Sequence, residues 1–522
     1  MTAEDRATTG AIDADRATPV ALNRTTPIAV VGTGTMGRGI AQVALAAGHQ
    51  VRLYDAVAGR AKTAAEAIAV RIDRMVAKGR LPVDDYSSRL LPAASLAELA
   101  DCGLVIEAIA EQLNIKQGLF AELEDIVAPE CLLATNTSSL SVTEIAGALK
   151  HPGRFVGLHF FNPAPLLPLV EVVSGFATDD SAAGCAYETA KAWGKTPVRC
   201  ADTPGFIVNR LARPFYAEAF RLYEERAADP ATIDAVLREC GGFKMGPFEL
   251  TDLIGQDVNE AVTRSVWKAF FRDPKFTPSL AQQRLVQSGR LGQKSGQGWF
   301  PYGEGVERPA PHTAEPCDAP KSVRLPGNVE GPLAQVVELI GAAGLQSRKV
   351  RLPLTPDDAI VLPGGTRLRL TDGLTATRSD GPTIHLDLAL DYRTCTRVAL
   401  APGADADPQD VQAAIGLFQK LGKKVSVIAD VPGMIVARTV AMLVDFALDA
   451  VSRGVAGRED IDTAMRLGVN YPRGPLDWGR ELGESWVWEV LDHINDLYPG
   501  DRYAPSRALD HLSDIDWKQD ER

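Results

Sequence analysis

"PIAVVGTGTMGRGIAQVALAAGHQVRLYD", residues 27–55, contains an apolar run, a GxGxxG motif at Gly32, Gly34 and Gly37, an alanine-rich segment and a second apolar run ending at Asp55. This order predicts a strand, a tight turn, a helix and a second strand, which together begin a dinucleotide-binding fold. Gly32 permits the turn, Gly34 lets the backbone approach a pyrophosphate, and Gly37 lets the helix pack closely on the strand. Asp55 can accept hydrogen bonds from the adenosine ribose and would repel a 2′-phosphate, so the motif favours NAD over NADP.

Alternating strand and helix patterns continue through residues 102–120 and 131–142. The fold class predicted for the N-terminal region is therefore α/β, a Rossmann-type doubly wound parallel sheet. Ligands of such sheets bind beyond the carboxyl ends of the strands. Four polar side chains follow the predicted strands and are candidate cofactor-binding residues, although each could instead be a loop polar group or a helix cap: Glu111, Lys116, Asn136 and Ser138.

One acid, Glu171, interrupts the apolar segment "LVEVV" at residues 169–173. A buried lone carboxylate is costly unless it is paired. The preceding predicted strand, "RFVGLHFFNP", carries His159 near its carboxyl end. A carboxylate that accepts the proton of one imidazole nitrogen fixes the tautomer and leaves the other nitrogen to take a proton from a substrate. We therefore expect a catalytic pair, the alternative for His159 being a structural histidine.

The composition excludes several function classes. The chain has 522 residues, enough for several domains, and a formal net charge of −12, which argues against nucleic acid or an anionic membrane as partner. Its seven scattered cysteines show neither metal nor disulfide spacing, so we expect no metal site and a cytoplasmic location. Residues 1–26 lack the features of a targeting signal and are expected to form a disordered tail, and no apolar stretch is long enough to span a membrane.

The second half of the chain contains a repeat. After Thr203 the apolar spacing becomes helical, which predicts an all-helical domain against the sheet. "GKTPVRCADTPGFIVNR" (residues 194–210) then recurs as "GKKVSVIADVPGMIVAR" (residues 422–438), with nine of seventeen positions identical at an offset of 228. Ordinary composition would give about one match. The sequence therefore predicts an internal duplication of the helical domain.

The motifs GTGTMGRGIA, IEAIAEQLNIKQGLF, NTSSLS, GLHFFNPAPLLPLVEVV and TPGFIVNRL resemble the 3-hydroxyacyl-CoA dehydrogenase family, in order and spacing, across about residues 27–302. The resemblance implies NAD-dependent oxidation of an L-3-hydroxyacyl-CoA to the 3-ketoacyl-CoA, as in β-oxidation. It implies that His159 is the general base, Glu171 its orienting partner, Ser138 a hydrogen-bond donor to the reacting oxygen, and Asn209 a group that positions the substrate. From residue type alone, Asn209 could instead be a helix cap.

The whole chain resembles the long bacterial members of this family that act in phenylacetate catabolism. Glu111 and Lys116 then resemble the family's cofactor-site residues. Five regions are expected: a tail at 1–26, the NAD-binding domain at 27–202, the first helical copy at 203–302, a linker or degenerate Rossmann remnant at 303–420, and the second helical copy at 421–516. The expected substrate is 3-hydroxyadipyl-CoA or a short-chain thioester such as 3-hydroxybutyryl-CoA. A noncatalytic NAD-binding scaffold and a lysine-dependent dehydrogenase of free 3-hydroxyacids are the other classes, and the His–Glu pair argues against both.

The second helical copy is expected to be noncatalytic. The offset of 228 maps His159, Glu171 and Asn209 to residues that cannot replace them, namely Asp387, Ala399 and Ala437. His385 lies two positions away, where a small gap could bring it into register. Because relatives in the family pair through their helical domains, the fused copy predicts a pseudo-dimer within one chain, with further homo-oligomerisation left open.

The sequence also offers basic side chains that could bind anionic groups of the substrate. Arg210 and Arg213 are candidates for a distal carboxylate of the acyl chain, and residues 71–80, "RIDRMVAKGR", for coenzyme A phosphates. In each case the alternative is a solvated charge on a helix face.

Overall fold

The computed structural model describes residues 20–327, 329, 331–350 and 359–510. It divides into two compact units, the first formed by residues up to 137 together with 142–197, and the second by 138–141 together with 198 onward. The first nineteen residues of the predicted tail and the predicted end of the second helical copy, 511–516, lie outside the described residues.

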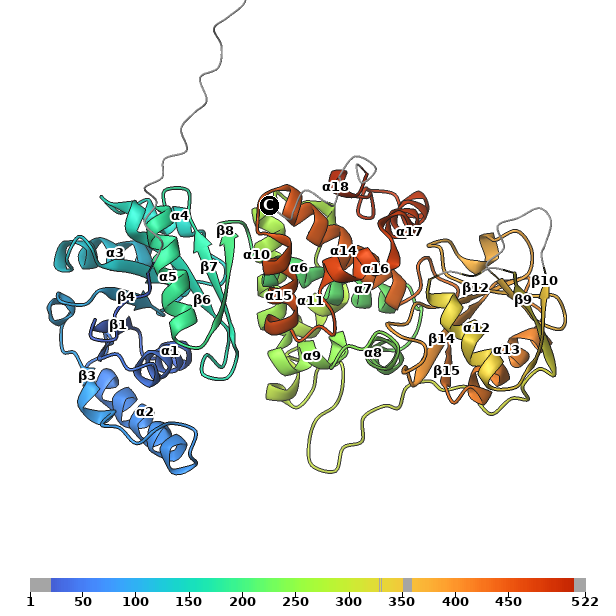
Figure 1. The fold of residues 1–522 in the computed structure, drawn as a ribbon, viewed down its shortest axis with the longest axis horizontal. Coiled ribbons are helices and arrows are strands. Elements are labelled where there is room, and N and C mark those ends of the chain that lie inside the picture. The colour runs from blue at the N-terminus through green and yellow to red at the C-terminus, as the bar shows by residue number, and fades with distance from the viewer. Residues whose placement is uncertain (1–19, 328, 330, 351–358, 511–522) are drawn as a thin grey trace, which may run out of the picture. The chain divides into compact units, whose positions relative to one another are not determined.

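The first unit is built on a sheet with the strand order β3-β2-β1-β4-β5-β6-β7-β8 (Figure 1). Strands β1 to β6 pair in parallel, and β7 runs antiparallel to β6. The predicted Rossmann-type parallel sheet is confirmed. Its elements are β1 (Ile28–Val31), α1 (Thr35–Ala46), β2 (Val51–Tyr54), α2 (Arg60–Ala77), β3 (Leu90–Pro92), β4 (Leu104–Glu107), α3 (Leu113–Ile126), β5 (Leu132–Thr135), α4 (Val142–Ala146), β6 (Phe155–Phe160), β7 (Leu169–Ser174), α5 (Asp180–Ala192) and β8 (Thr196–Ala201).

Burial explains why these strands read as continuous apolar runs. All residues of β1, β4, β5 and β6 are buried, as expected for parallel strands covered on both faces. The core of the unit joins these strands to the buried faces of α1 and α2. The apolar sequence of each strand therefore fixes its central place in the sheet.

Residues 20–26, which the sequence analysis assigns to the tail, are ordered against the first unit. The backbone N–H of Leu22 donates to Thr189 Oγ1 at 3.0 Å, and Leu22 packs against the core. The carbonyl of Thr26 lies 3.0 Å from His49 Nδ1. This part of the tail prediction is wrong, because one apolar side chain anchors the segment.

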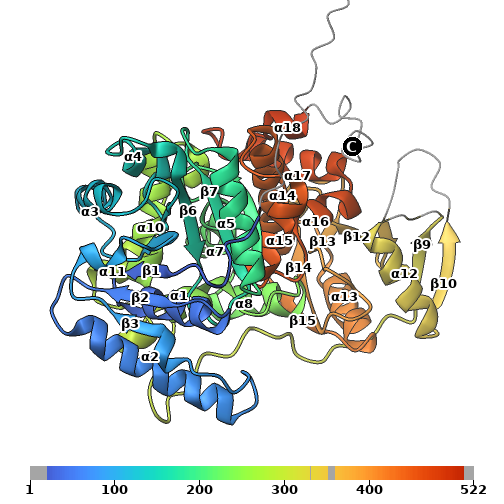
Figure 2. The ribbon, with the colours of Figure 1, turned by 60° about the vertical axis from the view of Figure 1, so that its left-hand side comes forward.

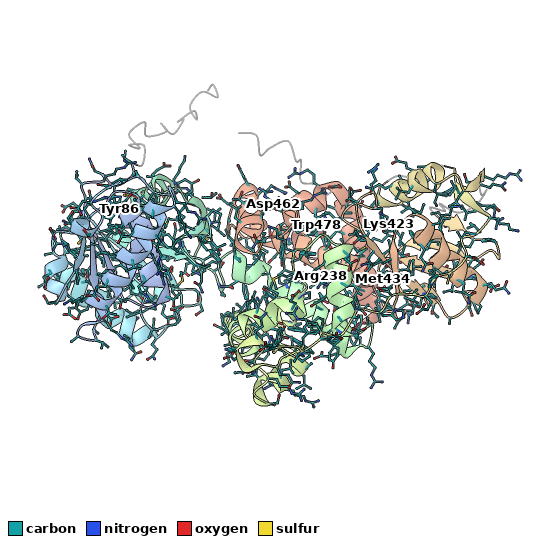
Figure 3. The ribbon with its side chains drawn as sticks, turned by 90° about the horizontal axis from the view of Figure 1, so that it is seen from below. Tyr86, Arg238, Lys423, Met434, Asp462 and Trp478 are labelled. Carbon is teal, nitrogen blue, oxygen red and sulfur yellow. The ribbon has the colours of Figure 1, made fainter. Side chains whose placement is uncertain are left out.

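The second unit contains a first helical group of six helices, in the region predicted as the first helical copy. They are α6 (Val208–Leu211), α7 (Arg213–Glu224), α8 (Pro230–Glu239), α9 (Pro247–Ile254), α10 (Gln256–Ala269) and α11 (Leu280–Gln287). A further helical group closes the described chain: α14 (Val436–Ser452), α15 (Arg458–Gly468), α16 (Pro475–Leu482), α17 (Glu484–Leu497) and α18 (Arg507–Asp510). Figures 1 and 2 both show the two groups side by side, and α14 contacts α7. Figure 3 labels Arg238 on α8 in the first group, and Asp462 and Trp478 in the second.

Between the two helical groups the chain forms a second sheet, with the order β10-β9-β11-β12-β13-β14-β15 among the described residues (Figure 1). Its pairings are mixed: β12 is parallel to β13, β13 antiparallel to β14, and β14 parallel to β15. The elements are β9 (Ser322–Pro326), α12 (Pro332–Ala342), β10 (Gln346–Val350), β11 (Ala359–Val361), β12 (Arg367–Leu370), β13 (Thr383–Leu386), β14 (Arg397–Pro402), α13 (Pro408–Lys420) and β15 (Lys424–Val427).

Element bounds in the two halves of the chain are related by the offset of 228 residues. Adding 228 to the bounds of β7, α5, α9 and α10 reproduces those of β14, α13, α16 and α17. Even the uncommon backbone conformation recurs, since Phe206 has φ 51° and Met434, labelled in Figure 3, has φ 52°. Both follow a glycine that also has positive φ, so the same tight turn leads into each helical group.

One capping interaction is also repeated. Asp234 accepts the backbone N–H groups of Phe248 and Glu249 at 3.0 and 2.9 Å, at the start of α9. Asp462 accepts those of Leu476 and Asp477 at 2.9 and 3.0 Å, at the start of α16. Each carboxylate satisfies two amides that have no partner within the helix, which fixes one helix against the next.

Candidate active site

The glycine-rich turn has the geometry that a dinucleotide requires. Gly32 adopts φ 97°, and a Cβ on Gly37 would lie 1.8 Å from the carbonyl oxygen of Gly32, so a side chain is excluded there. A Cβ on Gly34 would meet no atom of the described residues within 4 Å. Gly34 is the N-cap of α1, and no side chain among the described residues caps this helix. The turn therefore fits a pyrophosphate at the helix N-terminus.

Asp55 follows β2 and also organises this turn. Its Oδ2 accepts the backbone N–H of Thr33 at 3.0 Å and the Thr33 hydroxyl at 2.6 Å, while Oδ1 accepts the N–H of Val57 at 3.0 Å. Burial alone would raise the pKa of Asp55, but these hydrogen bonds lower it below its usual value. The carboxylate is therefore anionic. Sequence reasoning did not find Thr33, although it lies inside the motif.

The predicted catalytic pair lies at the junction of β6 and β7. His159 and Glu171 are opposite each other in the antiparallel register, and Nδ1 of His159 is 2.7 Å from Oε2 of Glu171. Glu171 is fully buried and His159 is nearly so. Two residues twelve positions apart are thus adjacent because the strands form a hairpin. The short contact fixes which imidazole nitrogen faces the carboxylate.

A second buried acid lies at the end of β4. Glu107 accepts the ammonium of Lys116 at 2.6 Å, the Thr135 hydroxyl at 2.7 Å and the backbone N–H of Ile109 at 2.6 Å. Lys116 is also 3.2 Å from Glu111, so the predicted cofactor residues Lys116 and Glu111 are joined. Glu107 was not among the residues predicted from the sequence. An acid ending an all-apolar strand was the available signal, as it was for Glu171.

Asn136 and Glu111 form hydrogen bonds near the ends of strands in the first unit. Asn136 Oδ1 accepts the backbone N–H of Phe160 at 2.8 Å, which connects the end of β5 to the end of β6. Glu111 accepts the Thr137 hydroxyl at 2.6 Å. Both polar groups therefore lie at the carboxyl edge of the sheet and have structural hydrogen bonds there.

Ser138 belongs with the second unit, where Asn209 Nδ2 donates to its carbonyl oxygen at 3.4 Å. Asn209 lies within α6, whose N-cap is Ile207, so it is not a helix cap. The neighbouring Ser141 donates its hydroxyl to Asp202 at 2.6 Å. Residues 138–141 are thus a segment of the first domain's sequence that is held by the second unit.

The two candidate arginines are neither solvated nor free. Arg210 pairs with Asp449 at 2.8 Å and is 2% exposed. Arg213 is buried and donates to Thr263 Oγ1 and to the carbonyl of Asn209, each at 2.8 Å. The alternative of a solvated charge on a helix face is therefore wrong for both side chains, because helix packing buries them.

The position equivalent to His159 has a structural role in the second half of the chain. Asp387 continues the register of β13 on β14, with its N–H donating to the carbonyl of Ala399. Asp387 and Ala399 therefore face each other in the second sheet as His159 and Glu171 do in the first. The register contains no gap that would move His385 to the position equivalent to His159. The Asp387 carboxylate accepts three backbone N–H groups at 2.9–3.0 Å, from Ile435, Val436 and Ala437 at the start of α14.

Comparison with known proteins agrees with this geometry. The family model "3-hydroxyacyl-CoA dehydrogenase, NAD binding domain" matches residues 27–203, and the model of the family's C-terminal domain matches both 205–302 and 433–521. A third model, "3-hydroxybutyryl-CoA dehydrogenase reduced Rossmann-fold domain", matches 368–432. The chain belongs to the 3-hydroxyacyl-CoA dehydrogenase family.

Several relatives extend the comparison. The chain is 45% identical over 485 residues to 3-hydroxyadipyl-CoA dehydrogenase of Escherichia coli K12, covering 92% of this chain and 96% of that protein. A crystal structure of 3-hydroxybutyryl-CoA dehydrogenase from E. coli K12 superposes with a TM-score of 0.84 at 44% identity, over 94% and 98% of the two chains. A probable 3-hydroxybutyryl-CoA dehydrogenase of Deinococcus radiodurans is 40% identical over 275 residues, 52% of this chain and 99% of that protein.

The family and these relatives define the reaction class. The chain is an oxidoreductase that uses NAD to oxidise a 3-hydroxyacyl-CoA to the 3-ketoacyl-CoA. Among the described residues, no helix has both the length and the apolar character needed to span a bilayer.

Proposed function

We propose that His159 is the general base and Glu171 its positioning partner. Oxidation of an alcohol requires the O–H proton to leave as the C–H bond breaks, so a base must lie within about 3 Å of that oxygen. NAD, when bound, supplies the hydride acceptor. Nε2 of His159 takes the proton, while Glu171, 2.7 Å from Nδ1, holds the ring and stabilises its protonated form. This buried contact is the single observation that supports the assignment most strongly.

The other predicted residues complete the proposed site. Ser138 donates to the reacting oxygen and Asn209 positions the substrate, an arrangement supported by the contact between Asn209 and the Ser138 carbonyl. Gly32, Gly34, Gly37 and Asp55 hold the dinucleotide, and Glu111, Lys116 and Asn136 complete its site.

We infer that the substrate is 3-hydroxyadipyl-CoA, with 3-hydroxybutyryl-CoA as the alternative. The length of the match to the E. coli 3-hydroxyadipyl-CoA dehydrogenase favours the first. The structural relative from E. coli is a 3-hydroxybutyryl-CoA dehydrogenase, which favours the second. The pathway is then phenylacetate catabolism or β-oxidation, in the cytoplasm.

The substrate assignment is tested by following NADH absorbance with 3-hydroxyadipyl-CoA, 3-hydroxybutyryl-CoA and free 3-hydroxybutyrate. We expect reduction of NAD only with the thioesters and a higher kcat/KM for the adipyl compound. Higher kcat/KM for the butyryl compound would select the alternative, and turnover of the free acid alone would overturn both.

We also propose that residues from about 368 onward are a duplicated and shortened copy of the region from β5 onward. The offset of 228 in the element bounds supports this, as does the order β12-β13-β14, which repeats the order and strand directions of β5-β6-β7. Two family models matched in the second half support it as well. The second copy is noncatalytic because Asp387, Ala399 and Ala437 replace the three functional side chains.

The two helical copies form a pseudo-dimer within the chain in this proposal. Its support is a buried ionic network in which Arg438 of the second copy donates to Glu218 and Glu225 of the first, at 2.9 and 2.7 Å. Light scattering of a chain truncated near residue 310 tests it. We expect the truncated chain to associate or aggregate, because it exposes the face of α7. A monomeric, soluble and active truncated chain would refute the pseudo-dimer.

A further inference from the structure

The two helical copies present equivalent arginines to one another. Arg210 and Arg438 are related by the offset of 228, and each reaches an acid on the other copy. Each also stacks over the equivalent aromatic ring, Arg210 over Phe270 at 4.9 Å and Arg438 over Tyr498 at 5.3 Å. The interface between the copies therefore contains two related arginine sites.

The Arg438 site is filled by side chains. Arg438 Nε donates to Glu218 Oε2 at 2.9 Å, and the hydroxyl of Tyr503 donates to the same carboxylate oxygen at 2.8 Å. Arg502 donates to the other oxygen at 2.7 Å. All of these groups are buried. A carboxylate with an aromatic ring beside it thus completes the surroundings of this arginine.

The Arg210 site differs at the corresponding position. The residue equivalent to Glu218 is Phe446, which has no carboxylate. Arg210 is 2% exposed, and its Nε has no hydrogen-bond partner among the described residues. A cavity of about 250 Å³ adjoins it, with aromatic walls formed by Phe270, Phe276 and Phe446.

The side chains that line this cavity include one more cation than acids, so an additional anion would balance their charge. Four cationic side chains line it, namely Arg210, Lys275, Arg453 and Arg507, against the three acids Asp273, Asp445 and Asp449. The acids already have partners: Lys275 is 2.6 Å from Asp445, Asp449 accepts from Arg210 and Arg453, and Asp273 accepts the backbone N–H of Lys275. In the part of the chain that the structure describes, Arg210 Nε is a buried nitrogen of this lining without an acceptor.

We propose that this cavity binds a small organic carboxylate, its carboxylate on Arg210 Nε and its apolar body between the three phenylalanines. The ligand takes the place that Glu218 and Tyr503 take in the related site. The cavity volume of about 250 Å³ is smaller than that of pockets for drug-sized ligands. The ligand is therefore a single ring or a short chain and not a nucleotide or coenzyme A.

Calorimetric titration of the full chain with benzoate, butyrate and inorganic phosphate tests this proposal. We expect one benzoate site per chain and weaker binding of phosphate, which has no apolar body. A charge-assisted hydrogen bond predicts that Arg210→Gln weakens benzoate binding by roughly 10- to 100-fold. Phe446→Glu should do the same by placing a carboxylate of the protein on Arg210. Arg480→Gln, which removes a solvent-exposed arginine on α16, is the matched control and should bind as the unmodified chain does.

Circular dichroism and NADH formation with a 3-hydroxyacyl-CoA confirm that each variant is folded. If Phe446→Glu does not fold, Arg210→Lys, which keeps the charge but removes Nε, gives the same test and should also weaken binding. The proposal is overturned if benzoate does not bind, if it binds Arg210→Gln as tightly as the unmodified chain, or if phosphate binds as tightly as benzoate. Dehydrogenase turnover is scored separately, so a negative result here leaves the proposed function standing.

Discussion

Nδ1 of His159 lies 2.7 Å from Oε2 of Glu171, and the two residues face each other across an antiparallel pair of strands. The hairpin itself therefore sets this distance. Because Glu171 is fully buried, its carboxylate has a defined orientation relative to the imidazole.

Removing the base should lower kcat with little effect on KM. We expect His159→Gln to lose roughly 10²- to 10⁴-fold in kcat, the range typical of general acid–base catalysis. Glu171→Gln should lose a similar order, because the amide has no negative charge to stabilise the protonated ring. Initial rates of NADH formation measure both. The control is His385→Gln, a buried histidine of the second sheet, which should keep full kcat. Undiminished kcat in His159→Gln would rule out the mechanism.

Gly34 and Gly37 of the glycine-rich turn should respond differently to substitution by alanine. Gly37→Ala forces a Cβ to 1.8 Å from the Gly32 carbonyl, so we expect a large loss of thermal stability. Gly34→Ala has free space in the protein, and we expect an unchanged melting temperature but an NAD dissociation constant raised by roughly tenfold or more, because the pyrophosphate approaches there. Differential scanning fluorimetry and NAD titration separate the two effects. Equal NAD affinity in Gly34→Ala would place the cofactor elsewhere.

Asp387 should act through stability rather than chemistry. Asp387→Ala leaves three buried backbone N–H groups at the start of α14 without their acceptor, at a cost of roughly 2 kcal/mol or more. Urea unfolding followed by tryptophan fluorescence measures this loss, with the exposed Asp380→Asn as control. We expect kcat per folded molecule to stay unchanged. A selective loss of kcat in Asp387→Ala would contradict the noncatalytic assignment of the second copy.

The interface between the helical copies should weaken in acid. Burial alone would raise the pKa of Glu218, but Arg502, Arg438 and Arg221 lower it to about 2. Because this pKa lies below that of the unfolded chain, about 4.3, the carboxylate stabilises the fold above pH 4.3 and the contribution is lost as the pH falls toward 2.

Replacing that carboxylate should therefore have a pH-dependent effect. We expect Glu218→Gln to lower the free energy of unfolding by roughly 3 to 5 kcal/mol at neutral pH, since it leaves buried arginines uncompensated. The difference from the unmodified chain should shrink between pH 4.3 and 2. Thermal unfolding across this range measures it, and Glu224→Gln, an exposed acid of the same helix, is the control. A difference that does not depend on pH would contradict the ionised state of Glu218.

The chemistry of the first unit was largely predictable from the sequence because its signals are local. GxGxxG before a helix predicts its own turn, and an acid inside an apolar strand predicts a partner. Glu107 carries the same signal as Glu171, yet its partner Lys116 is on the following helix, so spacing along the chain did not reveal the pair.

The sequence by itself determined the α/β fold of the first domain, the preference for NAD, the family, and the position of the repeat. These follow from periodicity, glycine placement and residue identity within short segments. Only the tertiary structure decided that Asp387 caps a helix, that residues 138–141 belong with the second unit, and that Arg210 and Arg438 differ in what completes their surroundings. Each depends on burial and on contacts between residues up to hundreds of positions apart, which the order of residues along the chain does not contain.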